Sequence, residues 1–171
     1  MTPTTRYARF FLSPLVSAVL ALSLLLASAS ALATLNPCVE GYHQLTIVVT
    51  TDAENVADGD ELWDDHHAYI KSSHKLVAGE PTPFIVAYSL TKGADRVNPL
   101  DPASGVTGRT TYVLNECYRT SDDILLHWSK TSAEWDRFVE IIAWMQRPGT
   151  QVVTLHDGLV RNSLWQLNDL L

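Results

Sequence analysis

The hydrophobic and polar positions of three stretches of the chain fit β-strands, in which successive side chains point to opposite faces, and neither face of the third stretch is cleanly polar. These stretches cover residues 42–51, 84–91 and 110–119, and each is rich in β-branched or aromatic side chains. One face of the third stretch is predicted to carry Thr110, Tyr112, Leu114, Glu116 and Tyr118. A carboxylate among apolar and aromatic neighbours is the most informative residue in this pattern.

Two other stretches follow the helical period. Residues 58–75 open with Asp58 and Glu61 in a capping-box arrangement, which predicts the start of a helix. A second helical region follows the third strand, and the pair Thr131 and Glu134 predicts a break within it. The apolar side chains beyond that break recur at helical spacing and are predicted to be core: Trp135, Phe138, Val139, Ile142 and Met145.

The remaining segments complete a fold of mixed type. Residues 93–108 contain several prolines and glycines and predict a long loop. Asp157 and Gly158 predict a tight hairpin turn, so that the last strand folds back on itself. The order strand, helix, strand, strand, helix, strand predicts an α+β fold, the ferredoxin-like split βαβ sandwich. It has a four-stranded antiparallel sheet with two helices on one face.

The N-terminal segment has the pattern of a signal peptide over residues 1–33. Arg6 and Arg9 precede a long apolar run, and small residues suited to cleavage follow it. An uncleaved membrane anchor is the alternative, because the apolar run is only slightly shorter than a spanning helix. Pro14 inside the run favours cleavage. We therefore expect residues 34–171 to form one exported domain, secreted or periplasmic.

The net charge of this expected domain limits the classes of partner that it can bind. Without Arg6 and Arg9, ten of the 12 basic side chains remain against 19 acidic ones, a formal charge of −9. An acidic chain without a basic cluster is poorly suited to nucleic acid or anionic lipid, so we expect no nucleic-acid partner and no membrane partner after cleavage. The sequence contains no Gly-rich phosphate loop, nucleophile elbow or zinc-binding helix motif.

Cys38 and Cys117 are the only two cysteines. An even number in an exported chain predicts a disulfide, and two separate buried thiols are the alternative. The predicted fold offers an independent check. In it the first and third strands are antiparallel neighbours, which brings the start of the first strand, near Cys38, beside the end of the third, near Cys117.

One run of residues resembles a known superfamily. Tyr112-Val113-Leu114-Asn115-Glu116-Cys117-Tyr118, followed by His127-Trp128, is similar to runs in uncharacterised members of the dimeric α+β barrel superfamily, which includes antibiotic-biosynthesis monooxygenases. The order of elements over residues 42–165 agrees with it. The resemblance implies a homodimer with two sheets face to face, and a pocket between helices and sheet. Haem-degrading members use an Asn on the first strand, which residues 42–51 lack, so those roles are not transferred and no cofactor is expected.

Three residues are candidates for proton transfer. Glu116 becomes a credible general base if its strand face points toward the helices, because burial raises the pKa of a carboxyl group. His127 follows closely and could pair with it, and His67 could line the same pocket from the first helix. The alternatives are a structural carboxylate paired with a basic side chain, a helix-to-sheet strut, and surface histidines.

The candidate ligand contacts are aromatic and imidazole side chains expected around the pocket: Trp63, His74, Tyr88, Tyr112 and Trp128. Buried core aromatics are the alternative for the two tyrosines. No metal site is expected, since His67 and His74 are two helical turns apart and too distant to share one ion directly.

Two functions remain open at this point. The first is an exported domain that binds a small aromatic or quinone-like ligand without catalysis. The second is a cofactor-free monooxygenase in which Glu116 and His127 transfer protons. Substitution of Glu116 by Gln separates them, because only an enzyme loses turnover while its fold stays intact.

Overall fold

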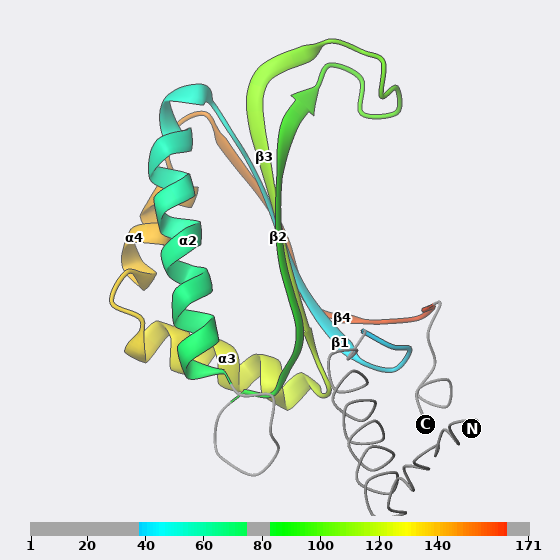
Figure 1. The fold of residues 1–171 in the computed structure, drawn as a ribbon, viewed down its shortest axis with the longest axis vertical. Helices are drawn as coiled ribbons and strands as arrows, with labels where there is room; N and C mark the ends of the chain where they lie inside the picture. Colours follow the sequence, from blue (N-terminus) through cyan, green and yellow to red (C-terminus); the bar gives the residue numbers. More distant parts are fainter. Residues whose placement is uncertain (1–37, 75–82, 164–171) are drawn as a thin grey trace, which may run out of the picture. The chain divides into compact units, whose positions relative to one another are not determined.

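Four antiparallel strands and three α-helices are found in the computed structural model, which describes residues 38–74 and 83–163 (Figure 1). The strands are β1 (His43–Thr51), β2 (Ile85–Arg96), β3 (Val106–Tyr118) and β4 (Thr150–Leu159). The helices are α2 (Val56–Ser73), α3 (Ser121–Glu134) and α4 (Phe138–Met145), and a 3-10 turn, η1 (Ala53–Asn55), precedes α2. The α+β class and the antiparallel sheet are therefore as predicted.

The strands lie in the order β2-β3-β1-β4, and the three helices all cover the same face of the sheet (Figure 1). Leu45, Ile47 and Val49 on β1 are buried toward the helices, whereas the residues between them are half-buried. In the antiparallel register, Glu116 on β3 lies between Leu45 of β1 and Tyr88 of β2. Because paired residues share a face, Glu116 also points toward the helices.

The core lies between the sheet and the helices. Fourteen buried apolar side chains form one cluster there, drawn from all three helices, from β1 to β3 and from the turn after α3. Gly59 lets α2 approach α4 closely, because a Cβ atom at this position would lie 2.4 Å from the Trp144 ring. Trp144 is fully buried, and its indole N–H donates to the Asn55 carbonyl at 2.9 Å.

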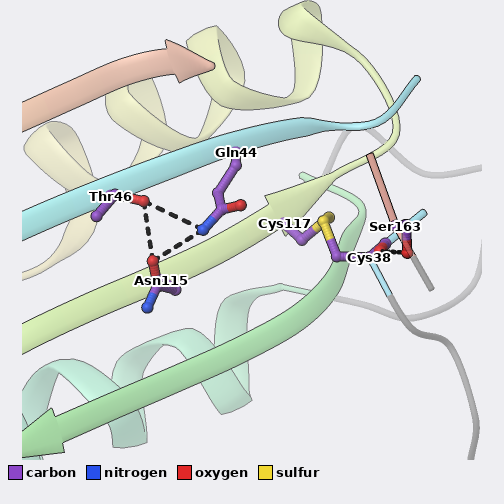
Figure 2. Close-up of a disulfide and its surroundings, with 6 residues drawn as sticks. All are labelled: Cys38, Gln44, Thr46, Asn115, Cys117 and Ser163. Atoms are coloured by element: carbon purple, nitrogen blue, oxygen red, sulfur yellow. Dashed lines mark hydrogen bonds between the residues drawn. A yellow bond between two sulfur atoms is a disulfide. The ribbon is translucent and has the colours of Figure 1, made fainter. Parts of the chain in front are cut away.

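The predicted disulfide between Cys38 and Cys117 is formed, with the two Cα atoms 5.9 Å apart (Figure 2). As expected from the fold, it joins the segment before β1 to the end of β3. Closing a loop of this size stabilises the fold by about 4 kcal/mol in the chain-entropy model. Close by, the Asn115 side-chain oxygen accepts hydrogen bonds from Gln44 and Thr46 (Figure 2).

The predicted hairpin at Asp157 and Gly158 is wrong, because β4 runs through both residues as one strand. Gly158 itself pairs with Gln44 of β1, and Leu155 pairs with Thr46, so one extra residue of β4 is accommodated as an irregularity between these two pairs. The Asp157 carboxylate accepts a hydrogen bond from Ser121 at 2.6 Å and contacts a ring nitrogen of His43 at 2.6 Å. The Asp-Gly pair therefore marks a β-bulge rather than a turn.

The predicted loop over residues 93–108 is too long. β2 continues to Arg96 and β3 begins at Val106, so the connection is confined to residues 97–105. Lys92, Gly93 and Ala94 pair with Tyr112, Thr111 and Thr110. The backbone ladder between neighbouring strands outweighs the low strand propensity of the glycines.

The helix boundaries also differ from those predicted from the sequence. The first helix starts at Val56 rather than Asp58, and its N-cap, Asn55, makes no side-chain capping bond. The second helical region is divided as predicted, but the division falls at residues 135–137, so Thr131 lies within α3. Thr131 is buried there, and burial outweighs its capping tendency.

One predicted core assignment is wrong. Val139 was expected in the core but is 77% exposed, whereas Ile141 is buried from the same helix. The signal peptide predicted over residues 1–33 lies outside the described residues. Among the residues that the structure describes, none of the helices has both the length and the apolar composition needed to cross a membrane.

Candidate functional site

Three chemically active side chains converge in the interior between the helices and the sheet. Glu116 comes from β3, His66 from α2 and His127 from α3, and their exposed fractions are 0%, 4% and 2%. Each lies on the inward face of its element. His66 shares the buried stripe of α2 with Trp63 and Ile70, three residues before it and four after it. We call His66, Glu116 and His127 the buried triad.

The Glu116 carboxyl group has one partnered oxygen and one unpartnered oxygen. Oε2 accepts a 2.6 Å hydrogen bond from the Tyr118 hydroxyl, while Oε1 is buried and has no hydrogen-bond partner among the residues that the structure describes. The nearest imidazole nitrogens are His127 Nε2, 3.5 Å from Oε2, and His66 Nε2, 3.9 Å from Oε1. Burial raises the pKa of Glu116 from 4.5 to about 7, although the Tyr118 hydrogen bond lowers it.

A hydrogen-bond chain assigns the protonation of His127. The Ser73 hydroxyl donates to the Tyr69 carbonyl at 2.7 Å, so its oxygen accepts from His74 Nδ1–H at 2.9 Å. Neutral His74 then accepts at Nε2 from His127 Nδ1–H, also at 2.9 Å. A neutral His127 therefore keeps its lone pair on Nε2, the nitrogen that faces Glu116.

The three buried histidines are neutral near pH 7. Burial, followed by the other histidines, lowers the pKa of His127 to about 2 and that of His66 to about 3. Burial and Lys130 lower the pKa of His74 to about 4. His66 contacts the Tyr88 hydroxyl through Nδ1 at 3.2 Å, which leaves its Nε2 on the side of Glu116.

An apolar cavity of about 40 Å³ adjoins the triad and is called the inner cavity. His66 and His127 contribute to its wall, and the remaining lining side chains are apolar or weakly polar: Ile47, Trp63, Leu114, Trp128, Thr131, Trp135, Phe138, Ile141, Ile142 and Met145. A groove of about 350 Å³, the outer groove, lies beside it and shares Ile47, Trp128, Ile142 and Met145. His156 lines the groove and packs its ring against Trp128.

The residues predicted from the sequence divide into two groups. Glu116, His127 and His74 are brought together, and Trp63 and Trp128 line the inner cavity. His67 is exposed and does not join the triad; its ring contacts that of Tyr88, with centroids 5.2 Å apart.

Tyr112 also lies away from the triad. Its hydroxyl donates to Asp60 and to the Val56 carbonyl, and its ring packs edge-on against Trp144. Tyr88, by contrast, reaches His66 through its hydroxyl.

Two contributors to the site were not singled out from the sequence. His66 takes the place expected for His67, and the signal that identifies it is its spacing from Trp63 and Ile70 on the buried stripe. Tyr118 lies two residues after Glu116, so both share the inward face of β3, and its hydroxyl reaches the carboxyl group.

The buried triad has the composition of a metal site. The Nε2 atoms of both histidines and a Glu116 oxygen all lie within 4.8 Å of one another, among the residues that the structure describes. Two imidazoles and one carboxylate are a common ligand set for transition metals. Without an ion, the same groups can hold a proton between Glu116 and His127 Nε2.

Comparison with known proteins gives no assignment for this site. No protein-family model matches the chain, and no curated protein matches it either. Functional conclusions therefore rest on the chemistry of the buried triad and the two spaces beside it.

Proposed function

We propose that the chain is an exported domain that binds a small aromatic, quinone-like ligand beside the buried triad. The observation that carries this proposal is an apolar, tryptophan-lined cavity with two imidazoles of a buried polar cluster in its wall. Ligand sites commonly combine apolar walls with a few polar groups that fix orientation. Export is supported by the disulfide, which is typical of oxidising compartments.

The sizes of the two spaces define how such a ligand binds. The inner cavity, at about 40 Å³, is smaller than the roughly 150 Å³ of an engineered cavity that takes up benzene. The ring therefore lies in the outer groove of about 350 Å³, with one edge toward the inner cavity. Trp128, Ile142 and Met145 stand between the two spaces and line both of them.

Unused hydrogen-bond donors favour a ligand that carries acceptor atoms. The indole N–H groups of Trp63 and Trp128 are buried and have no hydrogen-bond partner in the part of the chain that the structure describes. A buried donor left unpaired costs about 1–3 kcal/mol, which a ligand carbonyl would offset. A quinone supplies such carbonyls on an otherwise apolar ring.

Calorimetry with two matched ligands tests the binding proposal. A naphthoquinone sulfonate should bind more tightly than the corresponding naphthalene sulfonate, which lacks the carbonyl acceptors. Trp128→Phe keeps an aromatic ring but removes the N–H, and should weaken only the quinone, by about tenfold, the equivalent of one hydrogen bond. Equal affinity of the two ligands for the wild type, or no binding of either, would contradict the proposal.

A catalytic role is the second candidate, favoured by the contact between Glu116 and the lone pair of His127 Nε2. In a cofactor-free monooxygenation, this pair removes the hydroxyl proton of a phenolic ligand. Dioxygen then oxidises the ring to a quinone, with one oxygen atom entering the product and the other leaving as water. With 1-naphthol in an oxygen electrode, Glu116→Gln should lower oxygen uptake at least about 100-fold with an unchanged circular dichroism spectrum. Unchanged uptake would rule out this role.

For the fold itself, we propose the ferredoxin-like split βαβ arrangement and membership of the dimeric α+β barrel superfamily. The strand order, the position of all helices on one face and the run from Tyr112 to Trp128 support this. A homodimer would cover the other face of the sheet, where Val113, Val48 and Val153 form a row across three strands.

Sedimentation velocity tests the dimer. Val153 is 70% exposed in the single chain, and Val153→Glu would place a charge in the proposed interface. The wild type should sediment as a dimer and the variant as a monomer. A monomeric wild type at micromolar concentration would contradict the proposal.

A further inference from the structure

We propose that His66, Glu116 and His127 bind one divalent first-row transition-metal ion, such as Zn²⁺, in the interior of the domain. The inference goes beyond the proposed function, because an ion can occupy the buried triad whether or not the outer groove takes an organic ligand. It concerns the side-chain atoms that face one another at the triad: the Nε2 atoms of both imidazoles and the carboxylate oxygens of Glu116.

The distances between these atoms are close to those of a metal centre. A metal ion with bonds of about 2.1 Å places neighbouring ligand atoms about 3.0–3.4 Å apart. Here Glu116 Oε2 and His127 Nε2 are 3.5 Å apart, and Glu116 Oε1 and His66 Nε2 are 3.9 Å apart. The ligand atoms of the two histidines and Glu116 all lie within 4.8 Å of one another. Ion binding therefore requires the side chains to approach one another by up to about 1–1.5 Å, which side-chain rotation can supply.

The hydrogen bonding of the triad leaves a place for a cation. Glu116 Oε1 is fully buried, and within residues 38–74 and 83–163 it has no hydrogen-bond partner. The lone pair of His127 Nε2 faces Glu116 Oε2, which already accepts from the Tyr118 hydroxyl. Two acceptors thus face each other in a buried space. Either a proton or a cation must lie between them, and a cation satisfies the unpartnered Oε1 as well.

The outer hydrogen bonds orient both imidazoles for ion binding. Histidines that bind metals usually donate their other ring N–H to a neighbouring acceptor, which fixes the tautomer and the ring orientation. His127 donates through Nδ1 to His74, which is held in turn by Ser73. His66 has the Tyr88 oxygen 3.2 Å from its Nδ1. Both Nε2 atoms are therefore free to coordinate.

The ligand types select the kind of ion. Mg²⁺ and Ca²⁺ prefer oxygen ligands, whereas two imidazole nitrogens with one carboxylate suit zinc and its first-row neighbours. Three protein ligands leave at least one coordination position open. His66 and His127 both line the inner cavity, whose volume of about 40 Å³ is enough for water at that position.

Titration with Co²⁺ tests the proposal, because Co²⁺ occupies zinc sites and gives visible absorption bands. The full chain is expressed with its export segment, purified with the disulfide intact, and stripped of metal by a chelator. We expect one Co²⁺ per chain, displaced by one Zn²⁺ and not by excess Mg²⁺. Glu116→Gln and His127→Gln should each weaken Co²⁺ binding at least about 100-fold, because even residues that only orient metal ligands contribute 10–100-fold. His43→Gln serves as the matched control, since His43 pairs with Asp157 outside the triad.

The absence of Co²⁺ absorption at millimolar concentration, or an unchanged affinity in both triad variants, would overturn the proposal. If the variants do not fold, X-ray absorption of the zinc-loaded wild type decides: two imidazole ligands and one carboxylate support the proposal, and any other ligand set refutes it. Naphthoquinone binding is measured on the metal-free protein in parallel. If the protein binds naphthoquinone but not Co²⁺, only the metal site is refuted. If it binds Co²⁺ but not naphthoquinone, only the proposed ligand is refuted.

Discussion

Substitution of Glu116 by Gln should make the metal-free protein more stable at alkaline pH. Glu116 is enclosed, and its pKa is raised from 4.5 to about 7 because burial disfavours the charged form. Its contribution to stability is therefore complete below pH 4.5 and is lost as the pH rises through 7. A Gln side chain has nearly the same shape, can accept from Tyr118, and does not ionise.

The size of this effect follows from the two pKa values. The difference between 4.5 and about 7 corresponds to about 3 kcal/mol of unfolding free energy, most of it lost between pH 5 and pH 8. Over that range, the unfolding free energy of Glu116→Gln should rise by about 2–3 kcal/mol relative to that of the wild type. The buried histidines contribute nearly equally to both proteins, because burial and neighbouring histidines or Lys130 lower their pKa values.

Urea unfolding followed by tryptophan fluorescence, with a chelator present, measures this difference at several pH values. Glu54→Gln is the control, since Glu54 is an exposed glutamate at the start of the fold and its replacement should leave the pH dependence unchanged. If the stabilities of Glu116→Gln and the wild type change in parallel from pH 5 to pH 8, the carboxyl group is not enclosed. A wild type that becomes relatively more stable with rising pH would show a charge-stabilised carboxylate instead.

Three further predictions concern the fold around the site. Replacing Cys38 and Cys117 together by Ser should lower the free energy of unfolding in urea by about 4 kcal/mol, because the disulfide no longer restricts the unfolded chain. An unchanged unfolding midpoint would show that the disulfide does not stabilise the fold in this way. Gly59→Ala should lower the free energy of unfolding by about 1–3 kcal/mol despite the better helix propensity of alanine, because the added Cβ would overlap the Trp144 ring. A higher melting temperature would show that α2 and α4 can move apart freely. Acid should destabilise the protein below pH 6.5, because the three buried histidines bind protons in the unfolded chain and stay neutral in the folded one. His74→Gln should reduce the loss of unfolding free energy at pH 4.5 by about 2–3 kcal/mol, as measured by chemical unfolding at pH 6.5 and pH 4.5.

The fold was largely predictable because period-two alternation is strong on the buried strands. The sequence placed Glu116 on one strand face with Tyr112, Leu114 and Tyr118 and left open whether that face points toward the helices; the structure buries it there fully. The disulfide was predicted from the even number of cysteines, and the strand order supported it, since antiparallel pairing of the first and third strands brings Cys38 and Cys117 together. Both results depend on long-range pairing that a single hydrophobic face specifies.

Local signals failed where tertiary contacts opposed them. Asp157 and Gly158 carry a turn signal, but Gly158 and Leu155 both pair with β1, which converts the expected turn into a bulge. Thr131 and Glu134 resemble a capping box, yet Thr131 is buried in the middle of a helix. Short motifs report only local preferences, and neighbouring strands and helices decide between the alternatives.

The site was only half predictable for a similar reason. His66 and His67 are adjacent in sequence, and the spacing from Trp63 and Ile70 distinguishes His66 only once the buried stripe of the helix is known. The hydrogen-bond chain from Ser73 through His74 to His127 joins residues 53 positions apart, and no spacing rule reveals it. The ligand set of His66, Glu116 and His127 likewise comes from three different elements and has no sequence motif.

Nitrogen NMR of the histidine rings reports directly whether a neutral His127 presents a bare Nε2 to an enclosed Glu116. In the metal-free protein at pH 7, two-bond correlation spectra should show His127 protonated at Nδ1 alone, and this state should persist down to about pH 4. Addition of Zn²⁺ should shift the Nε2 resonances of His66 and His127 and leave that of His43 in place. A charged His127 ring at pH 7, or one protonated at Nε2, would contradict the account.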